Sequence, residues 1–243
     1  MKTVGSSDIG RRRSRNEDAY RFGSFDDGVA WAVVCDGMGG ASGGQVASTL
    51  AADIVSKKIQ KCYNKSMNER SLENLLLSAV TTANVDVFDK AEADSTLSGM
   101  GTTIVACVVK NNTACIAHAG DSRAYYIKSD SIEQITKDHS LVQEMLDNGQ
   151  ITKEEFENHP NKNIITRALG VGEDIDIDFN SVTLSENEAL IICTDGLSGC
   201  VSDEKMLEIY KSSDFEKLAS NLIDEANENG GKDNITVVVL KCD

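Results

Sequence analysis

Four aspartates in this sequence share one arrangement, because each lies close to glycine at the boundary of an apolar run. They are Asp36, Asp121, Asp195 and Asp233. Asp36 alone could be a helix cap, but the pattern of an apolar run, a small residue and Asp-Gly recurs at Asp195. Strand ends converge at the end of a packed sandwich, and carboxylates gathered there repel one another unless cations neutralise them. The pattern therefore predicts one shared cation site.

The residue types at this site favour a hard divalent ion. Carboxylate oxygens select Mg²⁺ or Mn²⁺, and the sequence has neither His/Cys spacing typical of a softer ion nor a calcium-binding helix–loop–helix pattern. Two carboxylate-held metals about 3.5–4 Å apart are the apparatus of phosphoester hydrolysis, since they activate water and hold the attacking and leaving oxygens in line.

A phosphate group would also need a cationic partner, and Arg13 is the candidate. Its guanidinium can bind two phosphate oxygens at once. Arg13 belongs to a stretch in which four arginines precede Glu17 and Asp18. The alternative interpretation of this stretch is a solvated loop whose charges neutralise one another.

Composition limits the classes of protein to which the chain can belong. It has 243 residues, one proline and no Ser/Gly-rich linker, which predicts a single domain over residues 1–243. A net charge of -15 argues against binding nucleic acid. The 7 cysteines form no Cys-x-x-Cys pair and fit reduced thiols. No apolar run is long enough to span a membrane, so we expect a cytoplasmic protein.

Apolar periodicity supplies the framework that must position these residues. In chain order it predicts strands, two helices, strands, two helices and a final strand. This is an α+β pattern, a four-layer α-β-β-α sandwich of two antiparallel sheets, each covered by a helix pair. The polar segment 149–165 is expected to run over the surface. The helices are expected to begin after Gly44 and at Ser71, and to span Ser140–Asn148, a turn from Thr152, Asp203–Tyr210 and Phe215–Asn229.

With these elements in place, the chain resembles the bacterial metal-dependent (PPM, type 2C) serine/threonine protein phosphatases. The resemblance covers Val4 to Leu240 in the family's order. It implies a β-sandwich flanked by helix pairs, with metals at one end and residues 149–165 as a flap subdomain beside them. The matching segments are Arg13–Asp18, Val34–Gly40, Gly99–Thr103, Gly120–Arg123, Asp138–Ser140, Ile165–Gly170, Cys193–Leu197 and Lys232–Asn234.

The resemblance implies metal-binding roles for five residues. Asp36 would bridge two Mn²⁺ or Mg²⁺ ions. The Gly37 carbonyl would bind the first ion, and Asp195 and Asp233 would bind the second. Asp121, together with Asp195, would hold a third and weaker ion.

The resemblance also implies the surrounding roles and the reaction. Arg13 would bind the substrate phosphate, Glu17 would hold a water, and Asp18 and Asn234 would orient metal-bound water and ligands from behind. The reaction would be hydrolysis of phosphoserine or phosphothreonine on proteins, by in-line attack of a metal-bridging hydroxide without a covalent intermediate. Phosphoprotein substrates and a cognate serine/threonine kinase would be the partners of a monomer that binds neither nucleic acid nor membrane.

Three positions depart from patterns seen in the family. Ala41 and Gln45 stand where bacterial members usually have a histidine and a glutamate, and Met38 stands where animal relatives have a candidate proton-donating histidine. The leaving-group proton is therefore expected to come from a metal-bound water. Structural roles are expected for the histidines, His118, His139 and His159.

Two alternative functions remain open at this point. One is a regulatory or binding module that keeps the fold but has little catalysis, for which Ala41 is the only support. The other is a metal-dependent hydrolase of a small phosphoester, which differs from the protein phosphatase only in its substrate.

Overall fold

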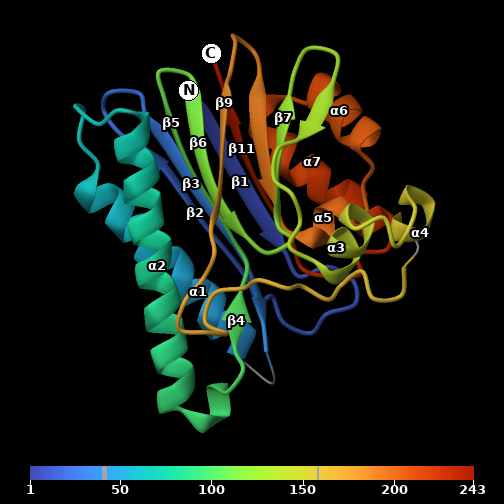
Figure 1. Cartoon of the computed structure of the whole chain (residues 1–243). Helices are drawn as coiled ribbons and strands as arrows, with labels where there is room; N and C mark the ends of the chain where they lie inside the picture. Colours follow the sequence, from blue (N-terminus) through green and yellow to red (C-terminus); the bar gives the residue numbers. More distant parts are fainter. Residues whose placement is uncertain (40–42, 158) are drawn as a thin grey trace.

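The chain folds into four layers, in which two β-sheets are stacked between two pairs of helices (Figure 1). The computed structural model describes residues 1–39, 43–157 and 159–243. Every pair of neighbouring strands in the two sheets is antiparallel. The predicted α+β sandwich is therefore confirmed. Gly40 and Ala41, which belong to the expected glycine turn, lie outside the described residues.

The first sheet contains the C-terminal strand as an inner strand, next to the edge strand at the N-terminus. Its order is β1 (Lys2–Asp8), β11 (Ile235–Lys241), β10 (Ala189–Cys193), β7 (Arg123–Ile127) and β8 (Ile132–Gln134). β1 pairs with β11 along its whole length, so the two ends of the chain lie together (Figure 1).

The second sheet contains the strand that carries Asp36. Its order is β2 (Asp18–Ser24), β3 (Ala30–Met38), β5 (Ile104–Lys110), β6 (Thr113–Ala119) and β9 (Asp178–Thr183), with β4 (Gly101–Thr102) paired to the end of β3. β5 and β6 form the expected hairpin, and Asn111 and Asn112 both adopt positive φ in its turn.

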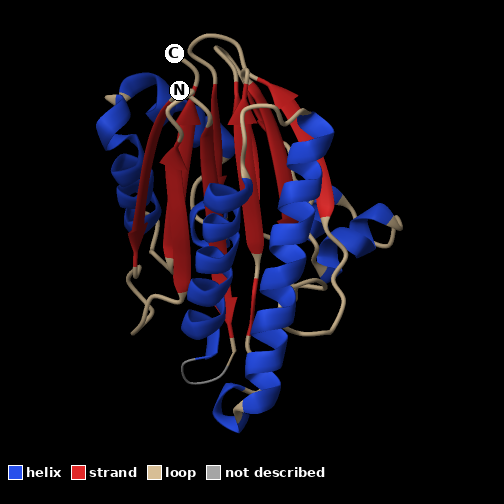
Figure 2. Ribbon diagram, turned by 90° about the vertical axis from the view of Figure 1, so that its left-hand side faces the viewer, coloured by secondary structure: helices blue, strands red, loops and turns tan. Residues whose placement is uncertain are grey.

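Helices cover the outer face of each sheet. α1 (Gly43–Cys62) and α2 (Glu69–Ala93) lie along the second sheet, as Figure 2 shows. α6 (Asp203–Ser212) and α7 (Phe215–Glu228) cover the first. Shorter helices are η1 (Ser95–Leu97), α3 (Leu141–Asp147), α4 (Lys153–Glu157) and α5 (Asp195–Ser198).

Three apolar cores hold the layers together. One lies between α1, α2 and the second sheet, one lies between the two sheets, and one lies between the first sheet and α6 and α7. Strand residues such as Val34 and Ile192 are fully buried between the sheets. Burying one such side chain contributes about 1.5–3 kcal/mol. The cores fix the strand ends, and the polar residues of interest lie at those ends.

One predicted helix boundary is wrong and another is confirmed. The predicted N-cap was Ser71, but α2 begins at Glu69 and its N-cap is Asn68. The Asn68 side chain accepts a hydrogen bond from the backbone N–H of Ser71, three residues later. Asn68 is as good a cap as serine, so propensity alone did not separate them. The capping box at Thr152 is present, because its N–H donates to Glu155 and its hydroxyl accepts from the Glu155 N–H.

None of the helices in the described ranges is both long enough and apolar enough to cross a membrane.

Candidate active site

Five aspartates come together where strands of both sheets end. Asp36 of β3 lies opposite Asp18 of β2 in the antiparallel register. Asp195 lies two residues after the end of β10, as the first residue of α5, and Asp233 lies just before β11, at the same end of that strand pair. Asp121 lies in the connection from β6 to β7. The carboxylates of Asp18, Asp121, Asp195 and Asp233 all act electrostatically on Asp36, so the chain brings the predicted ligands to one place.

Burial and mutual repulsion raise the pKa values of these carboxyls. Burial, followed by the charge of Asp233, raises the pKa of Asp195 to about 6. Burial, with a contribution from the charge of Asp195, raises the pKa of Asp18 and of Asp121 to about 7. The pKa of Asp36 is also raised, by burial first and then by its carboxylate neighbours. A bound divalent cation would reverse this electrostatic effect.

Two buried carboxylate oxygens in this group lack a hydrogen-bond partner within the described residues. They are Oδ1 of Asp18 and Oδ1 of Asp195. Leaving a charged buried acceptor unsatisfied costs more than the roughly 1–3 kcal/mol of a neutral one. A hydrated Mg²⁺ or Mn²⁺ ion would satisfy such oxygens, either directly or through its waters. The residues present therefore fit a divalent-ion site.

The second oxygen of Asp18 joins the two sheets. Its Oδ2 accepts hydrogen bonds from the hydroxyls of Thr194, at 2.9 Å, and Thr236, at 2.7 Å. Both threonines belong to the first sheet or follow it, whereas Asp18 begins β2 in the second. The carboxylate is thereby held with Oδ1 free of these bonds.

Two threonines of the Gly99–Thr103 segment hold the backbone of Asp36. The Thr102 hydroxyl donates to the Asp36 carbonyl at 2.9 Å, and the Thr103 hydroxyl accepts from the Asp36 N–H at 2.9 Å. The Thr103 hydroxyl also lies 2.7 Å from that of Ser122, which follows Asp121. Hydrogen bonds thus connect the backbone that carries Asp36 to the turn that carries Asp121.

Gly37 occupies a position that only glycine fits. A Cβ atom there would lie 2.1 Å from the Gly44 carbonyl oxygen and 2.5 Å from the Glu17 carbonyl oxygen. The Gly37 N–H donates to that Glu17 carbonyl at 3.2 Å. The first turn of α1 therefore packs directly on the backbone of Gly37, which keeps the carbonyl of this residue in a fixed position.

Asn234 holds the arginine-rich loop against the site. Its side-chain carbonyl accepts from the Glu17 N–H at 2.8 Å, and its amide donates to the carbonyls of Ile9, at 2.9 Å, and Arg15, at 2.8 Å. Arg13 lies between these anchor points and donates to Asp233 Oδ2 at 2.6 Å. The side chain of Arg13 is 52% exposed, so its guanidinium also faces solvent beside the carboxylates.

The site geometry agrees with a comparison of the whole chain against known families. The family model described as Protein phosphatase 2C matches residues 4–238. The chain belongs to the protein phosphatase 2C family. The recognition of a protein serine/threonine phosphatase in the sequence is thereby confirmed at the level of the family.

Relatives of this phosphatase support the assignment over nearly its full length. Serine/threonine phosphatase stp of Listeria innocua is 38% identical over 236 residues, which cover 97% of this chain and 93% of that one. The crystal structure of serine/threonine phosphatase Stp1 from Staphylococcus aureus is 33% identical, with a TM-score of 0.93 and coverage of 100% of this chain and 95% of that one. A structure of the catalytic domain of the phosphatase PstP, described as a complex with 2 manganese ions, is 32% identical, with a TM-score of 0.86 and coverage of 100% and 98%.

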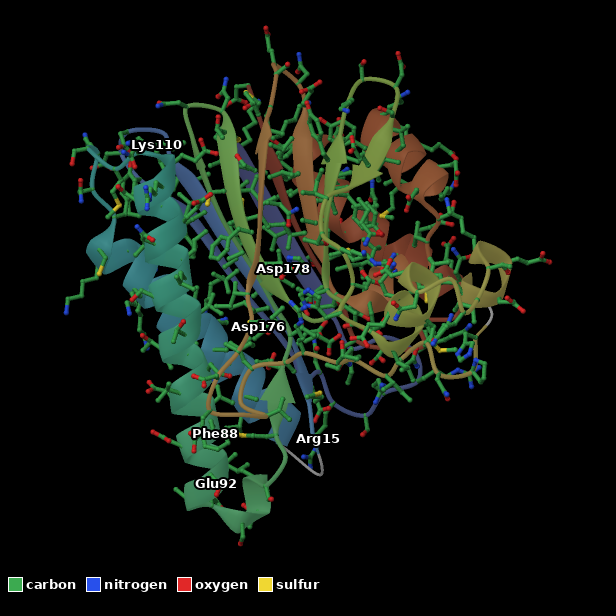
Figure 3. All side chains as sticks on the ribbon, viewed as in Figure 1. Arg15, Phe88, Glu92, Lys110, Asp176 and Asp178 are labelled. Carbon is green, nitrogen blue, oxygen red and sulfur yellow. The ribbon has the colours of Figure 1, made fainter. Side chains whose placement is uncertain are left out.

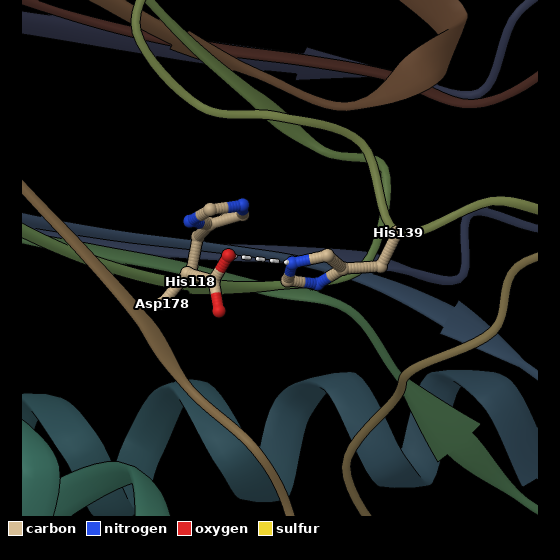
Figure 4. Close-up of side chains that lie close together, drawn as sticks. All are labelled: His118, His139 and Asp178. Atoms are coloured by element: carbon tan, nitrogen blue, oxygen red, sulfur yellow. Dashed lines mark hydrogen bonds and ion pairs between the residues drawn. The ribbon is translucent and has the colours of Figure 1, made fainter. Parts of the chain in front are cut away.

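Two of the three histidines of this phosphatase form a separate cluster with Asp178 (Figure 4). His118 and His139 stack with ring centroids 4.7 Å apart. His139 Nδ1 accepts from the Gly120 N–H at 3.1 Å, so Nε2 carries the proton that faces Asp178 Oδ2 at 3.2 Å. Arg167 lies 3.3 Å from the same Nε2. Both His139 nitrogens are engaged and the arginine alongside disfavours a second cation, whereas His118 Nδ1 is buried without a partner among the described residues.

A cavity of about 660 Å³ lies between the site and the segment 149–165. Its lining includes Asp121 and Asp195 of the site, together with Lys153, Phe156 and Lys162 of the segment 149–165. The cavity is large enough for side chains of a peptide. The sequence indicated the polar segment, but it gave no signal that Phe156 and the two lysines would face the carboxylates.

One strong ion pair beside this cavity was also not predicted. Arg123 binds Asp138 through two parallel hydrogen bonds, Nε to Oδ1 at 2.8 Å and Nη2 to Oδ2 at 2.6 Å. Both residues lie in segments that resemble the family, but neither was given a role. Of the departures from the family pattern, Gln45 is exposed in the first turn of α1 and Met38 lines a second cavity of about 350 Å³.

Proposed function

We propose that this phosphatase hydrolyses phosphoserine and phosphothreonine on protein substrates. The observation that supports the proposal most directly is that Asp36, Asp195 and Asp233 come together where Asp18 and Asp195 each keep one buried oxygen without a partner in the described residues. Membership of the protein phosphatase 2C family and the names of its relatives point to the same reaction. The 660 Å³ cavity beside the carboxylates has room for side chains of a peptide.

The proposal includes two Mn²⁺ or Mg²⁺ ions held by this carboxylate group. Asp36 would bridge them, the Gly37 carbonyl would bind the first, and Asp195 and Asp233 would bind the second. Asp121 would hold a third, weaker ion with Asp195. When bound, the ions would supply a hydroxide by lowering the pKa of a water, for in-line attack without a covalent intermediate.

The remaining residues of the site would act on the phosphate and on the ligands. Arg13 would bind the substrate phosphate, for which its exposed guanidinium beside Asp233 is well placed. Asp18, held by Thr194 and Thr236, and Asn234, held by three backbone groups, would orient the ligands. Glu17 would hold a water.

The experiment that tests the proposal compares Asp36→Asn and Asp195→Asn with the unaltered protein. Each substitution keeps the side-chain volume and removes a ligand charge, so hydrolysis of a phosphothreonine peptide with millimolar Mn²⁺ should be lost. Asp130→Asn, at an aspartate whose side chain is 92% exposed, is the matched control and should retain full activity. Full activity of both ligand variants, with unchanged circular dichroism, would overturn the proposal.

The same assay separates the two alternative functions. Phosphopeptides should be hydrolysed with a higher kcat/KM than small metabolite phosphoesters, and p-nitrophenyl phosphate should be hydrolysed as well. Failure to hydrolyse any of these over a wide pH range would favour a regulatory or binding module.

Several further expectations are part of the proposal. Residues 1–243 would form one catalytic domain with a flap subdomain at about 149–165. The protein would act as a cytoplasmic monomer that opposes a cognate serine/threonine kinase.

A further inference from the structure

The loop between β1 and β2 is strongly cationic in an acidic protein. The chain has a net charge of -15 with only 24 lysines and arginines. Four of these cations, Arg11, Arg12, Arg13 and Arg15, fall within five consecutive positions. We call residues 11–15 the arginine loop. The arginine loop is a positively charged region on an acidic protein, and it lies next to the carboxylate site.

Backbone packing holds the arginine loop beside Asp233. Gly10 has φ +80°, and a Cβ atom there would lie 2.1 Å from the Asp233 carbonyl oxygen. The Arg11 N–H donates to the Gly231 carbonyl at 2.7 Å, and a Cβ on Gly231 would lie 2.8 Å from Arg11 Cγ. Asn234 also binds the carbonyl of Ile9, which precedes the loop, and that of Arg15, its last residue. The fold therefore fixes the position of the loop backbone.

The arginines of this loop differ in whether they form ion pairs. Arg13 is bound to Asp233. Arg11 and Arg12 are exposed, and neither forms an ion pair within the residues that the structure describes. A guanidinium binds carboxylates and phosphates through its planar set of donors. Arg13 lies beside the position proposed for the substrate phosphate, and Arg11 and Arg12 are the two residues that precede it in the chain.

We propose that Arg11 and Arg12 bind acidic side chains that flank the phosphorylated residue of the substrate. The inference rests on the proposed function and specifies its substrate class: phosphoprotein segments in which aspartate or glutamate lies within about three residues of the phosphate. An extended peptide advances about 3.3 Å per residue, so such side chains fall within reach of neighbours of Arg13. The acidic remainder of the protein repels a long polyanion, which favours a short acidic peptide over nucleic acid.

The test compares two phosphothreonine peptides that differ only in their flanks, one with glutamate and the other with glutamine on both sides. The double variant Arg11→Ala/Arg12→Ala is assayed on both peptides and on p-nitrophenyl phosphate, which has no flanks. The control is Lys65→Ala/Arg70→Ala, which removes two exposed charges. The Lys65 carbonyl binds Lys110, and Figure 3 shows Lys110 at the opposite end of the molecule from Arg15.

The unaltered protein should hydrolyse the glutamate peptide with about a 3- to 10-fold higher kcat/KM than the glutamine peptide, mainly through KM, as expected for one or two exposed ion pairs. The ratio should fall in 0.5 M salt because exposed charges are screened. It should approach one in the double alanine variant and stay unchanged in the control. Arg11→Glu/Arg12→Glu should reverse the preference.

Three results would overturn the inference. They are a ratio near one in the unaltered protein, a ratio that survives the loss of both arginines, and an equal loss on both peptides and on p-nitrophenyl phosphate. The last result would show that the arginines support the catalytic centre. Absence of hydrolysis of every substrate by the unaltered protein would instead refute the proposed function itself.

Discussion

At the scale of single residues, the site is defined by acceptors that the protein leaves unsatisfied. Asp18 shows the principle most clearly, because two threonine hydroxyls bind one of its oxygens while the other has no partner in the described chain. Asp195 also keeps one buried oxygen without a partner. Most buried polar groups of a folded protein have a hydrogen-bond partner, and a bound divalent ion would supply the contacts that these two carboxylates lack.

Replacing Arg13 by alanine should weaken substrate binding more than turnover. A charge-assisted hydrogen bond contributes about 1.5–3 kcal/mol, so KM for a phosphopeptide should rise roughly 10-fold or more, with a smaller fall in kcat, because ground state and transition state share the contact. Steady-state kinetics check this. Arg13→Lys is the comparison variant, because it keeps the positive charge but cannot bind two phosphate oxygens at once. Unchanged KM values for both aryl phosphate and phosphopeptide would show that Arg13 does not bind the phosphate.

His139 should support binding of the weakest metal ion by accepting a hydrogen bond from the N–H of Gly120, the residue before Asp121. An asparagine at this position can still accept from the Gly120 N–H near the place of Nδ1, whereas a glutamine reaches toward Asp178 and loses that acceptor. His139→Asn should therefore keep the number of Mn²⁺ ions bound in calorimetric titration, and His139→Gln should lose the weakest one. Equal behaviour of the two variants, with equal melting temperatures, would reduce His139 to a packing residue.

At the scale of elements, the two sheets and their helices were predictable because long apolar runs and helical stripes leave few alternatives. The strands near Asp36 and Asp195 were evident from the apolar runs before Asp-Gly, although β3 continues past Asp36 to Met38, where it pairs with β4. Contacts between distant loops were not predictable. The pairing of Arg123 with Asp138 and the stacking of His118 on His139 depend on how strands β6 and β7 and the segments after them are brought together, and no periodicity in the sequence encodes that.

Gly37→Ala tests how tightly α1 is packed on the end of β3. The new methyl group would lie 2.1 Å from the Gly44 carbonyl oxygen, so the first turn of α1 must move. The free energy of unfolding should fall by about 1–3 kcal/mol, and activity should fall more steeply because the Gly37 carbonyl moves as well. Gly172→Ala is the control, since its nearest atom would be 3.5 Å away; chemical denaturation that shows equal stability for the two variants would contradict this packing.

At the scale of the whole molecule, the carboxylate group couples stability to pH and to metal. The pKa of Asp18 rises from 3.8 to about 7 in the folded protein. A carboxyl with a raised pKa contributes stability that is fully present below pH 3.8 and is lost as the pH rises through its folded pKa. Without metal, ionisation of these carboxyls therefore lowers the free energy of unfolding as the pH rises from about 4 to about 7.

Added Mn²⁺ should raise the melting temperature more at pH 8 than at pH 5.5. At the lower pH, protons compete with the metal for Asp18, Asp121 and Asp195. Burial lowers the pKa of His118 and of His139, which has the opposite effect on stability, but that effect is the same with and without the metal and cancels in the difference. Thermal denaturation with and without 1 mM Mn²⁺ measures the shift, and a larger shift at pH 5.5 would contradict the account.

The central claim is that Asp36, Asp195 and Asp233 hold divalent ions, and anomalous scattering from a crystal grown with Mn²⁺ tests it most directly. The account predicts two strong anomalous peaks about 3.5–4 Å apart, with the Asp36 carboxylate between them and the Gly37 carbonyl on one. A third, weaker peak is expected beside Asp121. Peaks confined to His118, His139 and Asp178, or no ordered Mn²⁺ at Asp36, would contradict it.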